Sequence, residues 1–383
     1  MSRAFLPYGR QEISDRDIEA VVDALRGPLI TQGPTIDRFE EALASFMGAK
    51  HVVAYANGTG ALHGAAFAAG LGPGDDLITT PITFAADANC ALYQGARPRF
   101  VDIDSATWNL DTAAAARAAD ERTRAVVAVS FTGLPVDLEP LQELRARGVR
   151  VIEDAAHALG GLRDGRPVGG PSGADMTIFS LHPVKALTTG EGGLVTTEDD
   201  ELARRLRMFR THGIVKEDMR PGPNEGGWYY EMQALGYNYR ITDFQCALGL
   251  SQLERLEDWV VARNQVADWY RELLAGEERI GLPPAAADGD RHGYHLFVVH
   301  VKGGAEARYT AFEALRAAGI GVQVHYIPIY RLPHYRDTLG YAQDECPAAE
   351  EYYWGAISLP MFPGVTRSDV ERVVRELKEA LPS

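Results

Sequence analysis

Short apolar stretches alternate along residues 36–210 with longer segments in which apolar side chains recur every three or four positions. The short stretches predict β-strands and the longer segments predict amphipathic helices, because each period places the apolar side chains on one face of its element. The strands are expected at residues 51–55, 76–79, 124–131, 149–153 and 176–181. Such alternation is typical of an α/β fold with a mostly parallel central sheet flanked by helices.

Two of the helices in this part of the chain carry end signals. The helix expected at residues 36–47 stops before Gly48, and the helix at residues 138–147 follows Asp137 and stops before Gly148. Glycine readily takes the left-handed conformation that ends a helix, and an aspartate side chain accepts hydrogen bonds from the free N–H groups at a helix start. Both signals therefore support the helical interpretation.

The alternating pattern is interrupted after residue 214. Residues 214–237 contain Pro221, Gly222 and Pro223 ahead of a cluster of aromatic residues. This composition predicts a long ordered loop, and long loops in compact domains are often functional.

A second structural unit is expected beyond this loop. A helix from residue 242 to about residue 256, continuing past Arg263, leads into it. Its own elements are a strand and two helices at residues 295–301, 310–318 and 367–381. We therefore expect an N-terminal arm and large domain over residues 1–255 and a small C-terminal α/β domain over residues 256–383.

Composition excludes several classes of function. The chain has 383 residues, of which 46% are hydrophobic, so it can bury a substantial core. Its net charge of -15 argues against a nucleic-acid-binding protein, which needs a basic surface to displace counterions. An anionic small molecule remains a possible ligand, because N–H groups at a helix start bind phosphate locally.

Cysteine usage and the N-terminus indicate the compartment. The three cysteines, Cys90, Cys246 and Cys346, lie far apart and form no C-x-x-C pair, so neither a disulfide framework nor a metal site is indicated. The first residues lack the apolar core of a signal peptide, and no apolar run is long enough to span a membrane. We therefore expect a cytoplasmic protein that does not contact a membrane.

The first segment with candidate chemistry is Asn57-Gly58-Thr59-Gly60, which follows a predicted strand and begins a helix. Free N–H groups at a helix start bind phosphate, and glycine lets an anion approach the backbone closely. A plain strand-to-helix turn explains the same residues, because short glycine-rich turns are weak motifs.

The second segment, residues 149–157, is a buried strand that ends in Glu153 and Asp154. Ligands of open α/β sheets bind at the carboxyl edge of the strands, so Asp154 lies where a cofactor would bind. A carboxylate there can hold the proton on a pyridine nitrogen, as a pyridoxal cofactor requires. Asp154 could equally cap a turn.

The third segment, residues 179–193, contains Lys185. A Schiff base requires a primary amine, which arginine cannot supply. The other lysines lie in polar or terminal positions that predict exposure: Lys50, Lys216, Lys302 and Lys378. Lys185 alone lies between a hydrophobic strand and a turn rich in threonine and glycine, which makes it the candidate nucleophile although isolated lysines are usually solvated.

Together these segments resemble the DegT/StrS-type sugar aminotransferases, a family of fold-type-I enzymes that use pyridoxal 5'-phosphate. The matching segments span nearly the whole chain: residues 29–34, 57–59, 80–84, 153–160, 180–185, 236–240 and 323–326. Residues 180–185, 251–253 and 325–330 are most similar to the branch that makes a UDP-4-amino-4,6-dideoxy sugar for pseudaminic acid.

The resemblance implies roles for the residues of the three segments. Lys185 would hold the cofactor as a Schiff base and then move a proton between the cofactor and the substrate carbon. Asp154 would pair with the pyridine nitrogen. Gly58, Thr59 and Ser180 would bind the cofactor phosphate through backbone and hydroxyl groups.

Further roles follow from the same resemblance. Phe84 would stack on the cofactor ring, although ordinary packing also explains an aromatic residue there. His157 would lie near the phenolic oxygen of the ring, at a position where many members carry glutamine. Asn238 would reach the phosphate in the partner subunit's site, which implies a homodimer with shared active sites.

The predicted sugar-nucleotide pocket and the reaction also rest on the resemblance. Residues that match pocket-lining segments are Thr31, His325, Tyr326 and Tyr330. L-Glutamate would donate its amino group to the cofactor, and the C4 ketone of a UDP-linked 4-keto-6-deoxy-N-acetylhexosamine would accept it. A dTDP-linked or C3-keto sugar is an alternative acceptor. A sugar dehydratase is disfavoured because such relatives replace the lysine by histidine, and a non-catalytic regulator is disfavoured because Lys185 and Asp154 are both present.

Overall fold

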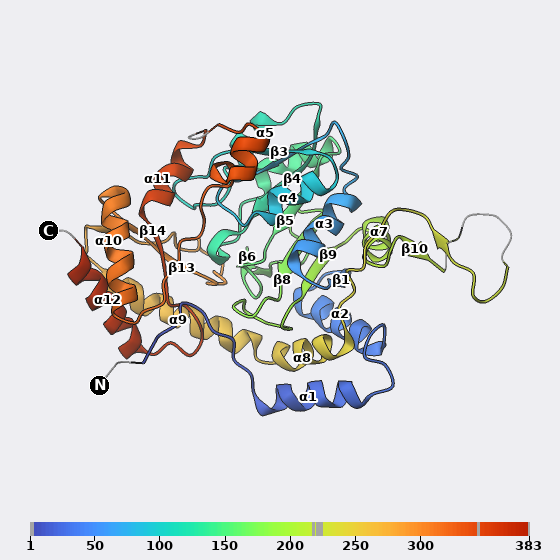
Figure 1. The fold of residues 1–383 in the computed structure, drawn as a ribbon, viewed down its shortest axis with the longest axis horizontal. Helices are drawn as coiled ribbons and strands as arrows, with labels where there is room; N and C mark the ends of the chain where they lie inside the picture. Colours follow the sequence, from blue (N-terminus) through green and yellow to red (C-terminus); the bar gives the residue numbers. More distant parts are fainter. Residues whose placement is uncertain (1–3, 217–218, 220–224, 343–344, 382–383) are drawn as a thin grey trace.

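The computed structural model describes residues 4–216, 219, 225–342 and 345–381. A seven-stranded sheet forms its centre in the order β1-β9-β8-β5-β4-β2-β3 (Figure 1). Its strands are β1 (His51–Tyr55), β2 (Asp76–Thr79), β3 (Arg97–Phe100), β4 (Thr123–Val129), β5 (Arg150–Asp154), β8 (Met176–Ser180) and β9 (Gly193–Thr197). Only β9 runs antiparallel to its neighbours β1 and β8, so the other strands all end at the same edge.

Five of these strands lie where the hydrophobic pattern predicts them. The strand expected at residues 124–131 ends at Val129, because Phe131–Gly133 form a 3-10 turn (η1) with Thr132 at a φ of 59°. The pattern gave no prediction for β3 and β9. The sequence of β3, Arg-Pro-Arg-Phe, has no apolar run, and proline is tolerated there because the strand lies at the edge of the sheet.

Helices cover both faces of the sheet, and the alternation of side chains along each strand supplies a core to each face. Val53 and Tyr55 of β1 pack with α3 (Gly58–Ala68), α4 (Ala86–Tyr93) and α7 (Asp200–Arg210). Val52 and Ala54 pack instead with α2 (Pro34–Met47) and α8 (Asp243–Leu253). Further helices are α1 (Asp15–Arg26), which lies along α8, and α5 (Thr112–Ala118), η2 (Glu139–Leu141) and α6 (Gln142–Ala146), near β4 and β5.

Two predicted helices are divided in the structure. The helix expected at residues 138–147 consists of η2 and the short α6, with Pro140, which has no N–H to donate, in the 3-10 part. The helix expected from residue 242 onward consists of α8 and α9 (Leu256–Leu274), which are separated at Glu254 and Arg255.

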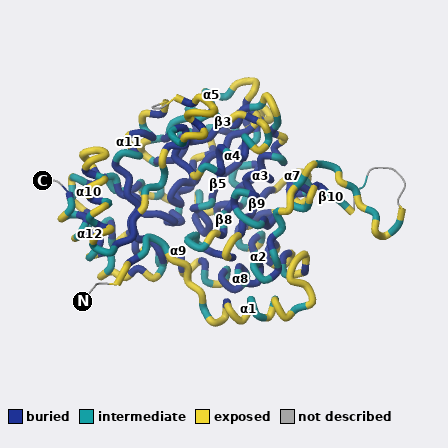
Figure 2. The backbone as a smooth tube through the Cα atoms, in the orientation of Figure 1, coloured by how far each residue is buried: buried dark blue, intermediate teal, exposed yellow. Residues whose placement is uncertain are grey.

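The C-terminal part of the chain has its own core beyond this break. The antiparallel strands β12 (Ile280–Gly281), β13 (Phe297–Val301) and β14 (Ala356–Leu359) pack with α9, α10 (Gly304–Ala317) and α12 (Arg367–Ala380). Figure 2 shows the buried backbone of this unit and of the central sheet. We propose a domain boundary near residue 255.

Other short elements are β6 (Leu162–Arg163), β7 (Arg166–Pro167), η3 (Ile329–Arg331), η4 (His334–Thr338) and α11 (Pro347–Gly355).

The described residues of the segment expected as a long loop project from the body of the molecule (Figure 1). It contains a pair of short antiparallel strands, β10 (Ile214–Val215) and β11 (Glu231–Met232). Pro221, Gly222 and Pro223 lie outside the described residues. Within the described part of the chain, no helix combines the length and apolar character needed to cross a membrane.

Candidate active site

Nine of the twelve predicted site residues line one pocket, with a volume of about 780 Å³, at the carboxyl edge of the sheet. Small-molecule sites commonly have volumes of about 300–1,000 Å³. The nine residues are Gly58, Thr59, Phe84, Asp154, His157, Ser180, Lys185, His325 and Tyr326. The pocket is therefore large enough for a cofactor together with part of a second ligand.

The turn between β1 and α3 forms one end of the pocket. Asn57 caps the helix, and its side chain accepts a hydrogen bond from the N–H of Gly60 at 2.8 Å. The first N–H groups of the helix, including those of Gly58 and Thr59, have no carbonyl partner within the helix. A side chain at position 58 would place its Cβ 3.0 Å from the Cβ of Ser180, so glycine permits the close approach of α3 and β8. The arrangement suits a bound phosphate.

The end of β5 directs only one of its two acids into the pocket. Glu153 points to the other face of the sheet, where it accepts hydrogen bonds from Ser130 at 2.5 Å and Arg163 at 2.6 Å. Asp154 lines the pocket and is only 6% exposed. One of its oxygens, Oδ1, accepts a hydrogen bond from the N–H of Ala156 at 2.8 Å. Burial raises the pKa of Asp154 above its usual value.

Lys185 lies in the loop that follows β8. Its N–H donates to the carbonyl of His182 at 2.9 Å, which closes a turn and fixes the start of the side chain. Burial lowers the pKa of Lys185 to about 8, while the carboxyl groups of Asp154 and Asp87 act in the opposite direction. A pKa of about 8 leaves about a tenth of this amine unprotonated at pH 7, far more than an ordinary lysine would have, and the unprotonated form is the nucleophile.

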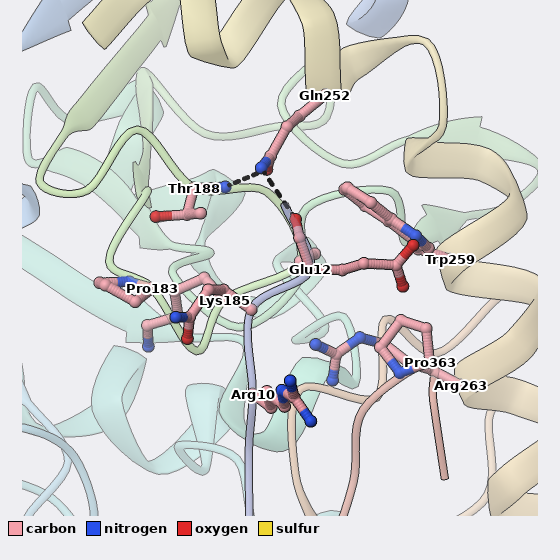
Figure 3. Close-up of a pocket in the computed structure, with 11 residues that line it drawn as sticks. Arg10, Glu12, Pro183, Lys185, Thr188, Gln252, Trp259, Arg263 and Pro363 are labelled. Carbon is pink, nitrogen blue, oxygen red and sulfur yellow. Dashed lines mark hydrogen bonds between the residues drawn. The ribbon is translucent and has the colours of Figure 1, made fainter. Parts of the chain in front are cut away.

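The side chain of Gln252 holds the loop that contains Lys185 through two hydrogen bonds (Figure 3). The amide oxygen of Gln252, on α8, accepts a hydrogen bond from the N–H of Thr188 at 3.0 Å. The amide nitrogen of Gln252 donates to the carbonyl of Glu12 at 3.2 Å, so one side chain ties the loop to the N-terminal arm. The remaining space here is about 20 Å³, enough for roughly one water molecule.

Imidazole and phenol groups form the opposite wall of the pocket. The rings of His157 and His295 lie 4.4 Å apart, and Nε2 of His157 lies 3.3 Å from the hydroxyl of Tyr326. Burial lowers the pKa of both imidazoles well below the usual value, with the positive charge of Lys185 adding to the effect. Nδ1 of each ring is buried and has no hydrogen-bond partner among the described residues. Neutral rings with unused nitrogens are suited to hydrogen-bond a polar ligand.

Three predicted residues lie away from this pocket in the described part of the chain. Thr31 is exposed and pairs with Thr242, and Asn238 is exposed beside Thr211. Tyr330 is fully buried in the core, where its hydroxyl donates to Glu350 at 2.8 Å.

Three residues of the site were missed by the sequence analysis: Asp87, His295 and Gln252. Asp87 is an acid on α4, His295 precedes β13, and Gln252 lies near the end of α8. The segment 251–253 was noticed only through its resemblance to a family. Spacing along the chain gives no signal for the other two, because tertiary packing alone brings His295 into the pocket and the buried Asp87 close to Asp154.

A comparison with protein families matches residues 11–378 to the DegT/DnrJ/EryC1/StrS aminotransferase family. The chain belongs to this family. It is therefore a sugar aminotransferase that depends on pyridoxal phosphate, and its central sheet and flanking helices are those of a fold-type-I enzyme. The predicted fold class, cofactor and enzyme class are confirmed.

Three curated relatives cover most of this aminotransferase. SpsC of Bacillus subtilis, a spore coat polysaccharide biosynthesis protein, is 38% identical over 380 residues, 98% of this chain and 97% of the relative. GDP-perosamine synthase of Caulobacter vibrioides is 37% identical over 352 residues, 91% of each chain. The UDP-4-amino-4,6-dideoxy-N-acetyl-beta-L-altrosamine transaminase of Campylobacter jejuni is 35% identical over 373 residues, 96% of this chain and 95% of the relative.

Two solved structures have the same fold as this chain. Helicobacter pylori PseC, an aminotransferase involved in the biosynthesis of pseudoaminic acid, matches with a TM-score of 0.89 at 30% identity, over 98% of this chain and 99% of PseC. Spr1654 of Streptococcus pneumoniae in its PLP form matches with a TM-score of 0.91 at 28% identity, over 99% of this chain and 100% of Spr1654.

Proposed function

We propose that this aminotransferase transfers the amino group of L-glutamate to the C4 ketone of a UDP-linked 4-keto-6-deoxy-N-acetylhexosamine. The observation that carries the proposal is the convergence of Lys185, Asp154 and the Gly58 turn on one pocket that has room for a second ligand. The choice of sugar rests on the likeness to the Campylobacter jejuni and Helicobacter pylori proteins. A GDP-linked keto sugar is the second candidate, favoured by the likeness to GDP-perosamine synthase.

The residues of the pocket fit pyridoxal phosphate. When bound, this cofactor supplies an electron sink and carries the amino group from the donor to the acceptor. The free N–H groups of Gly58 and Thr59, with the hydroxyl of Ser180, would hold its phosphate. Asp154 would pair with its ring nitrogen, and the unpaired Nδ1 of His157 leaves this residue able to bind the phenolic oxygen.

Lys185 has two tasks in this proposal. Its amine would bind the cofactor covalently in the resting enzyme, which the depressed pKa favours because only the neutral amine attacks a carbonyl. Once released, the same Nζ atom would take a proton from the donor carbon and later return one to the former ketone carbon. The turn with His182 and the contacts of Gln252 would keep the loop in place during both steps.

Phe84 would stack on the cofactor ring, and the neighbouring Tyr326 and His325 would hold the sugar. Phe84 is 60% exposed although it lines the pocket, so its face is accessible to the cofactor ring. Its ring centroid lies 6.3 Å from that of Tyr326, and His325 lies 5.7 Å from Tyr8 in the same wall. Burial lowers the pKa of His325 to about 4, so this imidazole is neutral when it meets the sugar hydroxyls.

A homodimer with shared sites would explain the positions of Thr31 and Asn238. Both lie on exposed segments that also expose large apolar side chains, namely Leu29, Ile30, Leu235 and Tyr237. Apolar side chains that gather around polar ones in this way mark protein interfaces. In the proposed dimer, Asn238 would reach the phosphate of the partner's cofactor and Thr31 would line the sugar-nucleotide site.

The visible absorbance of the cofactor on the purified enzyme tests both halves of the reaction. We expect L-glutamate to remove the visible absorbance band of the bound cofactor and a UDP-4-keto-6-deoxy-N-acetylhexosamine to restore this band. Because the two substrates react in turn, the kinetics should be ping-pong. GDP-linked and dTDP-linked keto sugars are the comparison substrates. Restoration by a GDP-linked sugar alone would refute the choice of nucleotide, and failure of L-glutamate to change the absorbance would refute the choice of donor.

A further inference from the structure

A second buried acid lies beside Asp154. Asp87, on α4, is 0% exposed, and its Oδ2 accepts a hydrogen bond from the hydroxyl of Thr83. Its Oδ1 is buried and receives no hydrogen bond from any N–H or O–H group of the described residues. The side chain of Asp87 instead lies close enough to that of Asp154 for the two acids to interact, because Ala86 and Cys90 of α4 pack with Ile152 and Ala156 on either side of Asp154.

A hydrogen bond between two carboxyl groups requires a proton on one of them, since an ionised carboxylate can only accept. Two neighbouring carboxylates in a buried site also repel each other too strongly for both to be ionised. Burial, then the negative charge of Asp154, raises the pKa of Asp87 well above its usual value. The other titratable groups that act on the pair are Lys185, Glu153, Cys90, Tyr326 and Tyr335.

Burial and position distinguish the acid that carries the proton, since each of the two acids accepts one hydrogen bond. Asp154 accepts its bond from the N–H of Ala156, is 6% exposed and lines the pocket, whereas Asp87 is 0% exposed and does not line it. Asp87 accepts on Oδ2 from Thr83, which leaves Oδ1 free to carry a hydrogen. Of the nearby cations, Lys185 acts on both acids and so does not favour ionisation of Asp87 alone.

We propose that Asp87 is a positioning residue that stays protonated at neutral pH and donates its proton to a hydrogen bond with Asp154. This inference rests on the proposed pairing of Asp154 with the ring nitrogen of the cofactor. The pair then carries a single negative charge, which balances one positive charge on the ring. The bond also makes Asp154 a weaker base, so the proton shared with the ring stays on the nitrogen.

Infrared spectroscopy of the apoenzyme tests the protonation directly, without cofactor or turnover. We expect the wild-type protein at pH 7 to show the carbonyl stretch of a buried carboxylic acid, and Asp87→Asn to lose it. Asp17→Asn is the matched control, because Asp17 is equally buried but paired with Arg255 at 2.6 Å, which keeps it ionised. A wild-type spectrum without such a band, or a band that persists in Asp87→Asn, overturns the proposal.

Cofactor affinity tests the positioning role. Asp87→Ala removes the donor and is expected to weaken cofactor binding about tenfold or more, because a hydrogen bond to a charged group is lost. Asp87→Asn can still accept from Thr83 and donate to Asp154, so it is expected to recover most of that loss. Equal weakening in both variants would show that Asp87 acts as an anion, and no weakening in either would show that it does not position Asp154. Should Asp87→Ala fail to fold, the infrared result on the isosteric Asp87→Asn decides.

The two experiments separate this inference from the proposed function. An acid band assigned to Asp87 in the apoenzyme, together with a holoenzyme that transfers no amino group to the expected sugar, would leave the inference intact and refute the substrate. Normal transamination of the expected sugar by an enzyme that lacks the acid band would support the proposed function and refute the protonation of Asp87.

Discussion

The predicted site residues lie in two regions of the chain, which differ in whether the chain itself buries them. Around Lys185 and Asp154, side chains from β5, β8, α3 and α4 are packed together, and the polar groups have partners or line one pocket. Around Thr31 and Asn238, the residues are exposed and lie among exposed apolar side chains. The first region is a pocket whose polar side chains are held by packing within one chain, and the second is an exposed surface with the apolar side chains that are typical of protein interfaces.

This difference separates two kinds of function. Groups that handle protons must keep fixed positions and shifted pKa values, which burial in a single rigid unit provides. Groups that complete a shared site can remain on the surface of each chain, because association buries them. Substitutions in the two regions should therefore have different consequences, and the expected effects decrease in the following order.

The largest effect is expected for Lys185→Ala, which removes the amine and its proton transfer. Transamination should fall at least about a thousandfold, since general acid–base catalysis alone contributes about 10²–10⁴-fold. Steady-state kinetics with L-glutamate would measure this, with circular dichroism to check the fold. Lys302→Ala, at an exposed lysine, is the control and should behave as wild type. Near-normal turnover of Lys185→Ala would contradict the catalytic assignment.

Asp154→Asn should reduce turnover about a hundredfold, because it removes the charge that stabilises the protonated ring. The pH dependence of the bound cofactor's absorbance should shift in the same variant, which a purely structural change would not cause. Glu153→Gln is an informative comparison, since Glu153 lies on the other face and pairs with Arg163. It is expected to lower stability without moving the absorbance profile, and a shift in that variant would mean that the two acids do not have separate roles.

A mixed dimer tests the second region. If active sites are shared, a dimer of one Lys185→Ala chain and one Asn238→Ala chain has one intact site, because the Asn238→Ala chain keeps its Lys185 and receives Asn238 from its partner. Co-expressed, separately tagged chains should then regain about half of the wild-type activity per mixed dimer, the fraction that twofold symmetry gives. Sites contained within single chains predict no recovery.

The smallest effect concerns the stability of the apoenzyme. Asp87 has a raised pKa in the folded protein, so at intermediate pH the folded state binds a proton that the unfolded state releases. The contribution of Asp87 to the free energy of unfolding should therefore decrease as pH rises above about 4, by up to about 1.4 kcal/mol per pH unit, until the folded-state pKa is passed. Urea unfolding at several pH values should give a smaller slope for Asp87→Asn. Equal slopes would show that Asp87 binds no extra proton on folding.

The sequence predicted most of the strands and site residues around Lys185 and Asp154, but little of which side chains pack against one another there. The strand positions were set by short apolar runs, and β3 was missed because an edge strand with two arginines and a proline has no such run. Lys185 was found by comparing the surroundings of a small number of lysines. His295 and Asp87 were missed, since nothing near either residue in the chain distinguishes it from an ordinary strand or helix residue.

The sequence by itself determined the α/β alternation, the family resemblance and the candidate lysine, because these depend on local patterns and on residue types. Only the tertiary structure decided that Asp154 rather than Glu153 enters the pocket, that His157 lies against His295, and that the buried Asp87 lies beside Asp154. Each of these contacts joins different elements or selects one face of a strand. The chain specifies such contacts only when helices and sheet pack into a single arrangement, because side-chain direction and burial are set by that packing.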